Sequence, residues 1–86
     1  DMTRLQHASG LLRLSWIAVD MNSPIEGETI GKLDIRNTTG VTVAGIMRTG
    51  RLISNPQLAF KFEAGDMVGA LGTPDQLKDF KKMVNE

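Results

Sequence analysis

Two stretches of this 86-residue chain decide its fold: LDIRNTTGVTV at residues 33–43 and GDMVGALGTPDQL at residues 65–77. The first is typical of a helix end followed by a strand, with Gly40 at the turn, because glycine readily adopts the left-handed conformation that ends helices. The second is typical of a turn, a short apolar strand and the start of a new helix. Both stretches are junctions between a helix and a strand, and together they predict a small α+β domain.

The regions around these junctions predict the remaining elements. Apolar and polar residues alternate at 12–19, which predicts a strand that is half-buried at its start and more fully buried at its end. Thr29 can cap a helix that runs to about Thr38. Residues 41–54 predict a hairpin that turns at Thr49-Gly50. Residues 58–63 alternate as well and predict either a short strand or an irregular segment.

The clearest local signal is the capping box at residues 73–76, in which a threonine, a proline and a glutamine start a helix. Three apolar residues then fall on one face of that helix: Leu77, Phe80 and Val84. The expected order is strand, helix, hairpin, strand, helix, and we expect a small mixed β-sheet with two helices packed on it. Residues 1–10 are expected to form a lead-in segment and residues 11–86 a single domain.

Composition excludes several kinds of site. The chain has no cysteine, which rules out thiol catalysis and zinc–thiolate or iron–sulfur sites. Lys plus Arg and Asp plus Glu are equal at ten each, whereas a nucleic-acid binder usually carries a basic excess. We therefore expect no nucleic-acid partner. His7 is the single histidine and lies near the terminus, so we expect the chain not to be an enzyme.

Charged residues around the first predicted helix are candidates for binding. Glu26, Glu28 and Asp34 offer the oxygen ligands that a hard cation such as calcium prefers, although carboxylates also complement the positive end of a helix. Asp34 and Arg36 are two positions apart on the predicted helix, so they can contact separate partners, such as a ligand or a neighbouring subunit. Ile35 between them is expected to be exposed enough to pack on an apolar group. The alternative is that both charges only complete the helix end and its loop.

In their order and spacing these stretches resemble the TrkA-C (RCK-C) domain, the C-terminal lobe of the cytosolic regulators of bacterial potassium channels and potassium/proton antiporters. The resemblance covers about residues 14–84 and includes the hairpin and both junctions. It implies a domain on the cytoplasmic side of the cell membrane that forms a homodimer and binds a small-molecule regulator between protomers. Such a domain gates, by allostery, a membrane transport domain of the same or an associated chain. The alternative is a ligand-free structural dimerisation module of the same kind of transporter.

The resemblance also implies a ligand and its contacts. Several family members bind cyclic di-AMP and others a divalent cation, so cyclic di-AMP is the first expectation and a divalent cation the second. Carried over residue by residue, the expected ligand contacts are Ile30, Asp34, Ile35, Arg36, Thr42 and Pro56. Two places depart from the family pattern. Gly31 stands where an apolar residue is usual, and residues 57–62 carry large apolar side chains that either fill the core or thicken a dimer contact.

Overall fold

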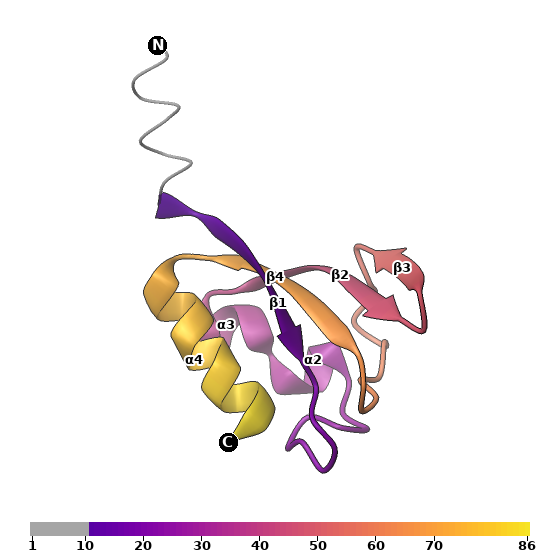
Figure 1. The fold of residues 1–86 in the computed structure, drawn as a ribbon. Helices are drawn as coiled ribbons and strands as arrows, with labels where there is room; N and C mark the ends of the chain where they lie inside the picture. Colours follow the sequence, from indigo (N-terminus) through magenta and orange to yellow (C-terminus); the bar gives the residue numbers. More distant parts are fainter. Residues whose placement is uncertain (1–10) are drawn as a thin grey trace.

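The computed structural model describes residues 11–86, which form one four-stranded sheet with helices beside it (Figure 1). The expected lead-in segment and His7 lie outside the described residues. In chain order the elements are β1 (Arg13–Ala18), α2 (Ile30–Leu33), α3 (Ile35–Thr39), β2 (Thr42–Arg48), β3 (Arg51–Ser54), β4 (Met67–Gly72) and α4 (Pro74–Asn85). The predicted α+β class and element order are confirmed, although the first helix is broken into α2 and α3.

The sheet has the strand order β1-β4-β2-β3, and all of its pairings are antiparallel. The prediction of a mixed sheet was wrong in this respect. A helical crossover joins β1 to β2, and such a connection would give a parallel pair if the two strands were neighbours. The last strand, β4, lies between them instead and runs opposite to both. The short apolar strand predicted within residues 65–77 is confirmed as β4.

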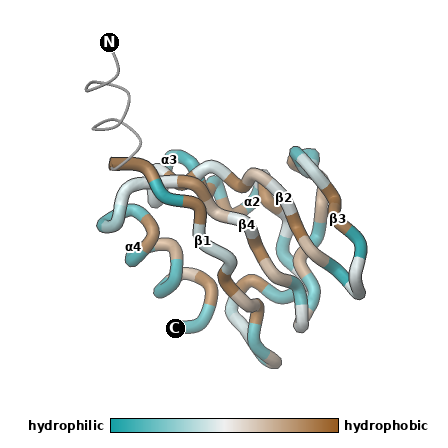
Figure 2. The backbone as a smooth tube through the Cα atoms, turned by 45° about the horizontal axis from the view of Figure 1, so that its top comes forward, coloured by the Kyte–Doolittle hydropathy of each residue, from teal (hydrophilic) through white to brown (hydrophobic). Residues whose placement is uncertain are grey.

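The two faces of the sheet differ in what covers them. Helices α2, α3 and α4 lie on one face (Figure 1). The buried core lies between them and the sheet and is made of Ile17, Val19, Ile25, Ile35, Val41, Ile46, Phe62, Val68, Ala70, Leu77, Phe80 and Val84. On the other face Leu14 pairs with Leu71, and Trp16 with Gly69. Leu14 and Trp16 are exposed there, and Figure 2 shows the hydrophobic segments along the strands. The start of β1 is therefore less buried than its sequence pattern predicted.

Most of the predicted turns and caps are confirmed. Thr29 caps α2 through the N–H of Lys32, and Gly40 ends α3 with φ 83°. The hairpin turns at Thr49-Gly50, where both residues have positive φ, and the capping box at the start of α4 has both of its hydrogen bonds. Residues 58–63 form an irregular segment with an isolated bridge between Thr29 and Lys61. Among the described residues, no helix is long and apolar enough to cross a membrane.

Candidate functional site

Most of the predicted ligand contacts line one hollow beside the broken helix. Its volume is about 220 Å³. The walls come from the two short helices, from the start of β2 and from the segment that follows β3. The lining residues are Ile30, Ile35, Arg36, Val41, Thr42, Val43, Asn55, Pro56 and Leu58. Five of the six predicted contacts are among them, and Asp34 is not.

Asp34 forms the break between α2 and α3. Its backbone is left-handed, with φ 50° and ψ 47°, and its N–H donates to the carbonyls of Ile30 and Gly31. Aspartate tolerates this conformation better than most residues. The carboxylate accepts a hydrogen bond of 2.9 Å from the Asn37 side chain. Asp34 therefore sets the direction of α3, and with it the position of Arg36, without lining the hollow itself.

Ile35 differs from its prediction. Its side chain is 3% exposed and belongs to the core, so the expectation that it is free to pack on an outside group was wrong. The reason is the break at Asp34, which starts a new helix whose buried residues, Ile35 and Thr39, face inward. Ile35 forms part of the floor of the hollow, whereas Arg36 and Thr42 are exposed around it.

The part of the lining that follows β3 is held by backbone hydrogen bonds. The N–H of Gly31 donates to the carbonyl of Leu58 over 2.9 Å, and the N–H of Ile30 donates to that of Phe60 over 3.0 Å. A β-bulge interrupts the pairing of β2 with β4 at Ala44, and the carbonyl of Ala44 accepts from the N–H of Asn55 over 3.0 Å. These bonds attach the segment after β3 to both α2 and β2. Pro56 and Leu58 are therefore fixed in place although they lie in a loop.

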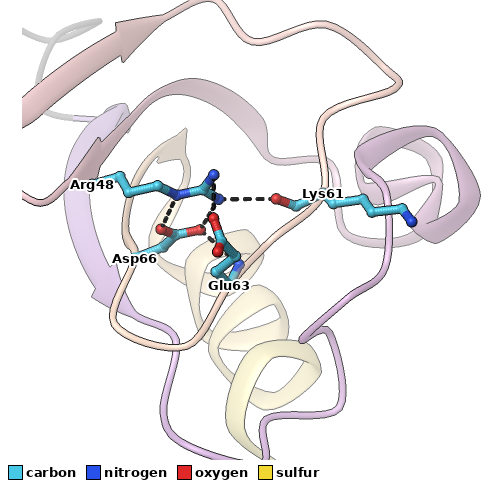
Figure 3. A network of polar contacts seen from close by, with 4 residues as sticks. All are labelled: Arg48, Lys61, Glu63 and Asp66. Carbon is cyan, nitrogen blue, oxygen red and sulfur yellow. Dashed lines mark hydrogen bonds and ion pairs between the residues drawn. The ribbon is translucent and has the colours of Figure 1, made fainter.

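A polar network anchors the far end of the same segment (Figure 3). Arg48 donates to both oxygens of Asp66, each over 2.8 Å, and to the carbonyl of Lys61 over 2.9 Å. It also forms an ion pair with Glu63, and its guanidinium lies 4.7 Å from the centre of the Phe60 ring. Burial favours the neutral acid, but hydrogen bonds from Arg48 and from the N–H of Glu63, with the charge of Arg48, lower the pKa of Asp66 below its ordinary value.

The charge around the hollow is positive. No acidic residue lines it, and within residues 11–86 the guanidinium of Arg36 forms no ion pair. An arginine that has no carboxylate partner within the domain can donate hydrogen bonds to the phosphate or carboxylate of a ligand. Beside it lie the apolar side chains of Ile30, Pro56 and Leu58. The arrangement suits a ligand that has both an anionic group and an apolar face.

The carboxylates that suggested a cation site are not gathered. Glu28 pairs with Lys32, Glu26 accepts from the N–H of Asn22, and Asp34 accepts from Asn37. Across the described part of the chain, no group of three acidic, histidine or cysteine side chains is arranged to hold a metal ion.

A larger hollow of about 430 Å³ lies between β1 and α4, and its lining includes Trp16 and three basic residues, Arg13, Lys78 and Lys81.

The sequence prediction missed four of the lining residues: Val41, Val43, Asn55 and Leu58. Leu58 is the most exposed apolar side chain among them. It is 71% exposed, the highest exposed fraction of any leucine in the described part of the chain. The signal was present, because residues 57–62 depart from the family pattern, but a large apolar residue in a loop is typical of core filling as well. Phe62 does fill the core, whereas Leu58 does not.

Comparison with known proteins identifies the family. Residues 14–85 match the model of the TrkA-C domain. The chain belongs to the TrkA-C domain family. Among solved structures, the TrkA-C fold here is similar to the RCK_C domain dimer of S. agalactiae BusR in complex with c-di-AMP, with a TM-score of 0.79 and 29% identity over 87% of this chain and 93% of that one.

Two curated relatives carry a TrkA-C-like region within longer proteins. One is the ammonium/H(+) antiporter subunit AmhM of Alkalihalophilus pseudofirmus, 23% identical over 81% of this chain. The other is the probable potassium channel protein 2 of Methanocaldococcus jannaschii, 28% identical over 87% of this chain. This chain spans 42% and 22% of their respective lengths. The resemblance inferred from the sequence is therefore confirmed at the level of the family and the fold.

Proposed function

We propose that this chain is the regulatory ligand-binding and dimerisation domain of a potassium or other cation transport protein, on the cytoplasmic side of the membrane. The observation that carries the proposal is the hollow in which Arg36, which forms no ion pair within residues 11–86, lies beside the apolar side chains of Ile30 and Pro56. Membership of the TrkA-C family supports the regulatory role. The role is one of binding, with no catalytic step assigned to any residue.

Cyclic di-AMP is the ligand we propose. It combines two phosphates with two flat bases whose faces can pack on apolar side chains, which matches the positive charge and the apolar wall of the hollow. The BusR domain with which this chain shares 29% identity is a dimer in complex with the same compound. A divalent cation has less support, because Glu26, Glu28 and Asp34 each contact a different group and do not converge on one point.

The proposed mechanism is a population shift. Two copies form a symmetric dimer with the hollow of each protomer at the seam, so that one ligand contacts both. A ligand that binds one spacing of the protomers more tightly shifts the population toward that spacing. If each protomer is attached to a transport domain, the shift changes the balance between its open and closed states, by at most the difference in ligand affinity between the two spacings.

Calorimetry with purified protein tests the ligand site. Cyclic di-AMP should bind the wild-type chain, and Arg36→Ala should weaken binding by about tenfold or more, as expected for the loss of a charge-assisted hydrogen bond. Arg51→Ala is the matched control, because Arg51 is an exposed arginine outside this hollow. Unchanged binding by Arg36→Ala would show that the ligand does not bind in this hollow. Loss of binding in Arg13→Ala would show that it binds in the groove between β1 and α4.

A ligand-free dimerisation module is the second candidate. The uncovered face of the sheet favours it, since Leu14, Trp16 and Leu52 expose apolar surface there that a second copy would bury. Sedimentation and calorimetry together separate the two functions. A stable dimer that gives no heat with cyclic di-AMP, other nucleotides or calcium supports the module, whereas a ligand-dependent dimer supports the regulatory domain.

A further inference from the structure

Strand β1 lies at one edge of the sheet. It pairs with β4 on one side, and within residues 11–86 no strand pairs with its other side (Figure 1). Helix α4 runs beside β1 in the same direction, because it starts just after Gly72, the partner of Arg13, and its last residue, Asn85, contacts Ala18. The unpaired N–H and carbonyl groups of an edge strand are a template for another extended chain.

The far end of this edge is already occupied by a side chain. The amide of Asn85 donates to the carbonyl of Ala18 over 2.9 Å and accepts from the N–H of Asp20 over 3.1 Å. Val19, between these two residues, instead donates to the carbonyl of Asp66 on the β4 side. Asn85 therefore makes the two hydrogen bonds that a residue of a neighbouring strand would make, and it closes this end of the edge.

Leu14 and Trp16 lie on the part of the edge that stays open. Their backbone groups point the same way as those of Ala18, because successive residues of a strand direct these groups to opposite edges in turn. Their side chains lie on the uncovered face of the sheet and are 54% and 46% exposed. A chain that pairs at this edge can therefore also cover two apolar side chains with its own.

The groove on the other side of the edge, between β1 and α4, is basic. Its lining includes the buried side chains of Ile17 and Leu77 and the exposed cations of Arg13, Lys78 and Lys81. No acidic residue lines it, and within residues 11–86 none of the three cations forms an ion pair. Because side chains of an extended chain alternate between two sides, carboxylates at every second position of such a chain would meet these cations.

We propose that the open edge of β1 binds an extended acidic segment of a partner protein, which joins the sheet as an additional strand. The carboxylates of the partner lie over the groove between β1 and α4, and its alternate apolar residues cover Leu14 and Trp16. Main-chain hydrogen bonds give such a complex its affinity, and the side chains give it specificity. The edge is separate from the proposed cyclic di-AMP site, because the two hollows share no lining residue.

Two other occupants do not balance the charge of the groove. A second copy of this chain would bring the same three basic residues to the seam, where like charges repel one another. Residues 1–10 contain one acidic and one basic residue, Asp1 and Arg4, so they offer no excess of carboxylates. An acidic segment of another protein neutralises all three cations.

A capped peptide of about eight residues, with alternating glutamate and valine, tests the proposal. Trp16 is the single tryptophan, and its emission should shift to the blue when the valine side chains cover it. The peptide should bind with a dissociation constant below about 1 mM. Binding should weaken as salt is added, because salt screens exposed charges. The absence of a saturable shift at several times that concentration would overturn the proposal.

Charge reversal tests the role of the groove. The double variant Lys78→Glu/Lys81→Glu should bind the glutamate peptide at least about tenfold more weakly, because two attractions become repulsions. It should bind the matching lysine–valine peptide instead, which the wild type should not. Lys82→Glu is the matched control, since Lys82 is an exposed lysine of the same helix outside the groove lining. Circular dichroism checks that each variant is folded. An equal loss in Lys82→Glu would contradict the proposal, because the peptide would then respond only to the overall charge of α4.

A change in the peptide backbone tests the strand pairing. Methylation of alternate backbone nitrogens keeps every side chain but blocks the main-chain hydrogen bonds, so the methylated peptide should not bind. Undiminished binding would mean that charge alone attracts the peptide, and the proposal would be wrong.

Three further outcomes identify other occupants or separate this edge from the ligand site. If the peptide splits a dimer in sedimentation, the edge is a contact between copies and the proposal is wrong. If cyclic di-AMP displaces the peptide, the two share one site and the proposal is wrong as well. If the peptide binds and cyclic di-AMP does not, the proposed ligand site fails while the role of the β1 edge stands.

Discussion

Arg48 donates two parallel hydrogen bonds to Asp66, each 2.8 Å long, and Asp66 is only 1% exposed. The pair joins the end of β2 to the loop that leads into β4, and it anchors the segment that carries Leu58 (Figure 3). A planar arginine matches both oxygens of a carboxylate, so the pair fixes direction as well as distance. The same arginine also contacts Glu63, which is largely exposed.

Asp66→Ala should therefore lower the free energy of unfolding by about 2–4 kcal/mol, because it removes bonds from Arg48 and from the N–H of Glu63 in a buried place. Glu63→Ala is the matched control. It removes the exposed partner of the same arginine and should cost less than about 1 kcal/mol. Urea unfolding of the three proteins measures both values. Equal losses of unfolding free energy in the two variants would contradict the view that the Asp66 contact stabilises the fold more because it is buried.

The lowered pKa of Asp66 predicts a dependence of stability on acid. Because the folded state holds the carboxylate in its charged form, the stabilisation is fully present above the unfolded-state pKa of about 3.9 and is lost as the pH falls through the lower folded-state pKa. The difference in unfolding free energy between wild type and Asp66→Asn should therefore shrink as the pH falls below about 4. Urea titrations at several pH values measure this difference, and two parallel pH profiles would contradict the prediction.

Gly40 couples the end of α3 to the start of α4. It has φ 83°, and a β-carbon there would lie 2.5 Å from the side-chain nitrogen Nε2 of Gln76. The side-chain oxygen of Gln76 accepts the hydrogen bond from the N–H of Thr73 that caps α4. Gly40→Ala should cost about 2–3 kcal/mol, from backbone strain and the displaced cap. Gly27→Ala shares the positive φ but meets no neighbour, and should cost only about 1 kcal/mol.

The coupling itself is tested by a double-mutant cycle. In a Gln76→Ala background the clash with the side chain is gone, so Gly40→Ala should cost about as much as Gly27→Ala does in the wild type. Thermal or urea unfolding of the four proteins in the cycle gives the coupling energy. Strictly additive losses would mean that the penalty at Gly40 comes from its backbone alone.

The comparison between prediction and structure shows which signals are local. Gly40, Thr29 and the capping box were predictable because each acts within one turn of helix. The break at Asp34 was not, since its left-handed backbone depends on the way α3 packs against the core. The sequence also failed to predict that Ile35 is buried and that Leu14 is exposed. Period-two alternation tells which residues share a face of a strand, but not which face the helices cover.

The candidate site was predictable in part for the same reason. Arg36 and Thr42 lie near each other in the sequence, on either side of the Gly40 turn, and both line the hollow. Their contact with a ligand stays a prediction. The position of Leu58 in the lining depends on a contact with Gly31, 27 positions earlier in the chain. That contact exists because backbone hydrogen bonds bring two irregular segments together, and no periodic pattern in the sequence reports it.

Trp16 provides a reporter for the position of the dimer seam and the ligand. It is the single tryptophan of the chain, it is 46% exposed, and β1 lies at the edge of the sheet opposite β3. If two copies meet at the hollow, neither dimer formation nor cyclic di-AMP should change the solvent around this side chain. Its emission maximum should then stay constant across a dilution series and a ligand titration, and shift to the red only on unfolding in urea. A blue shift on dimer formation would place the seam on the uncovered sheet face, and one on ligand addition would place the ligand in the groove between β1 and α4.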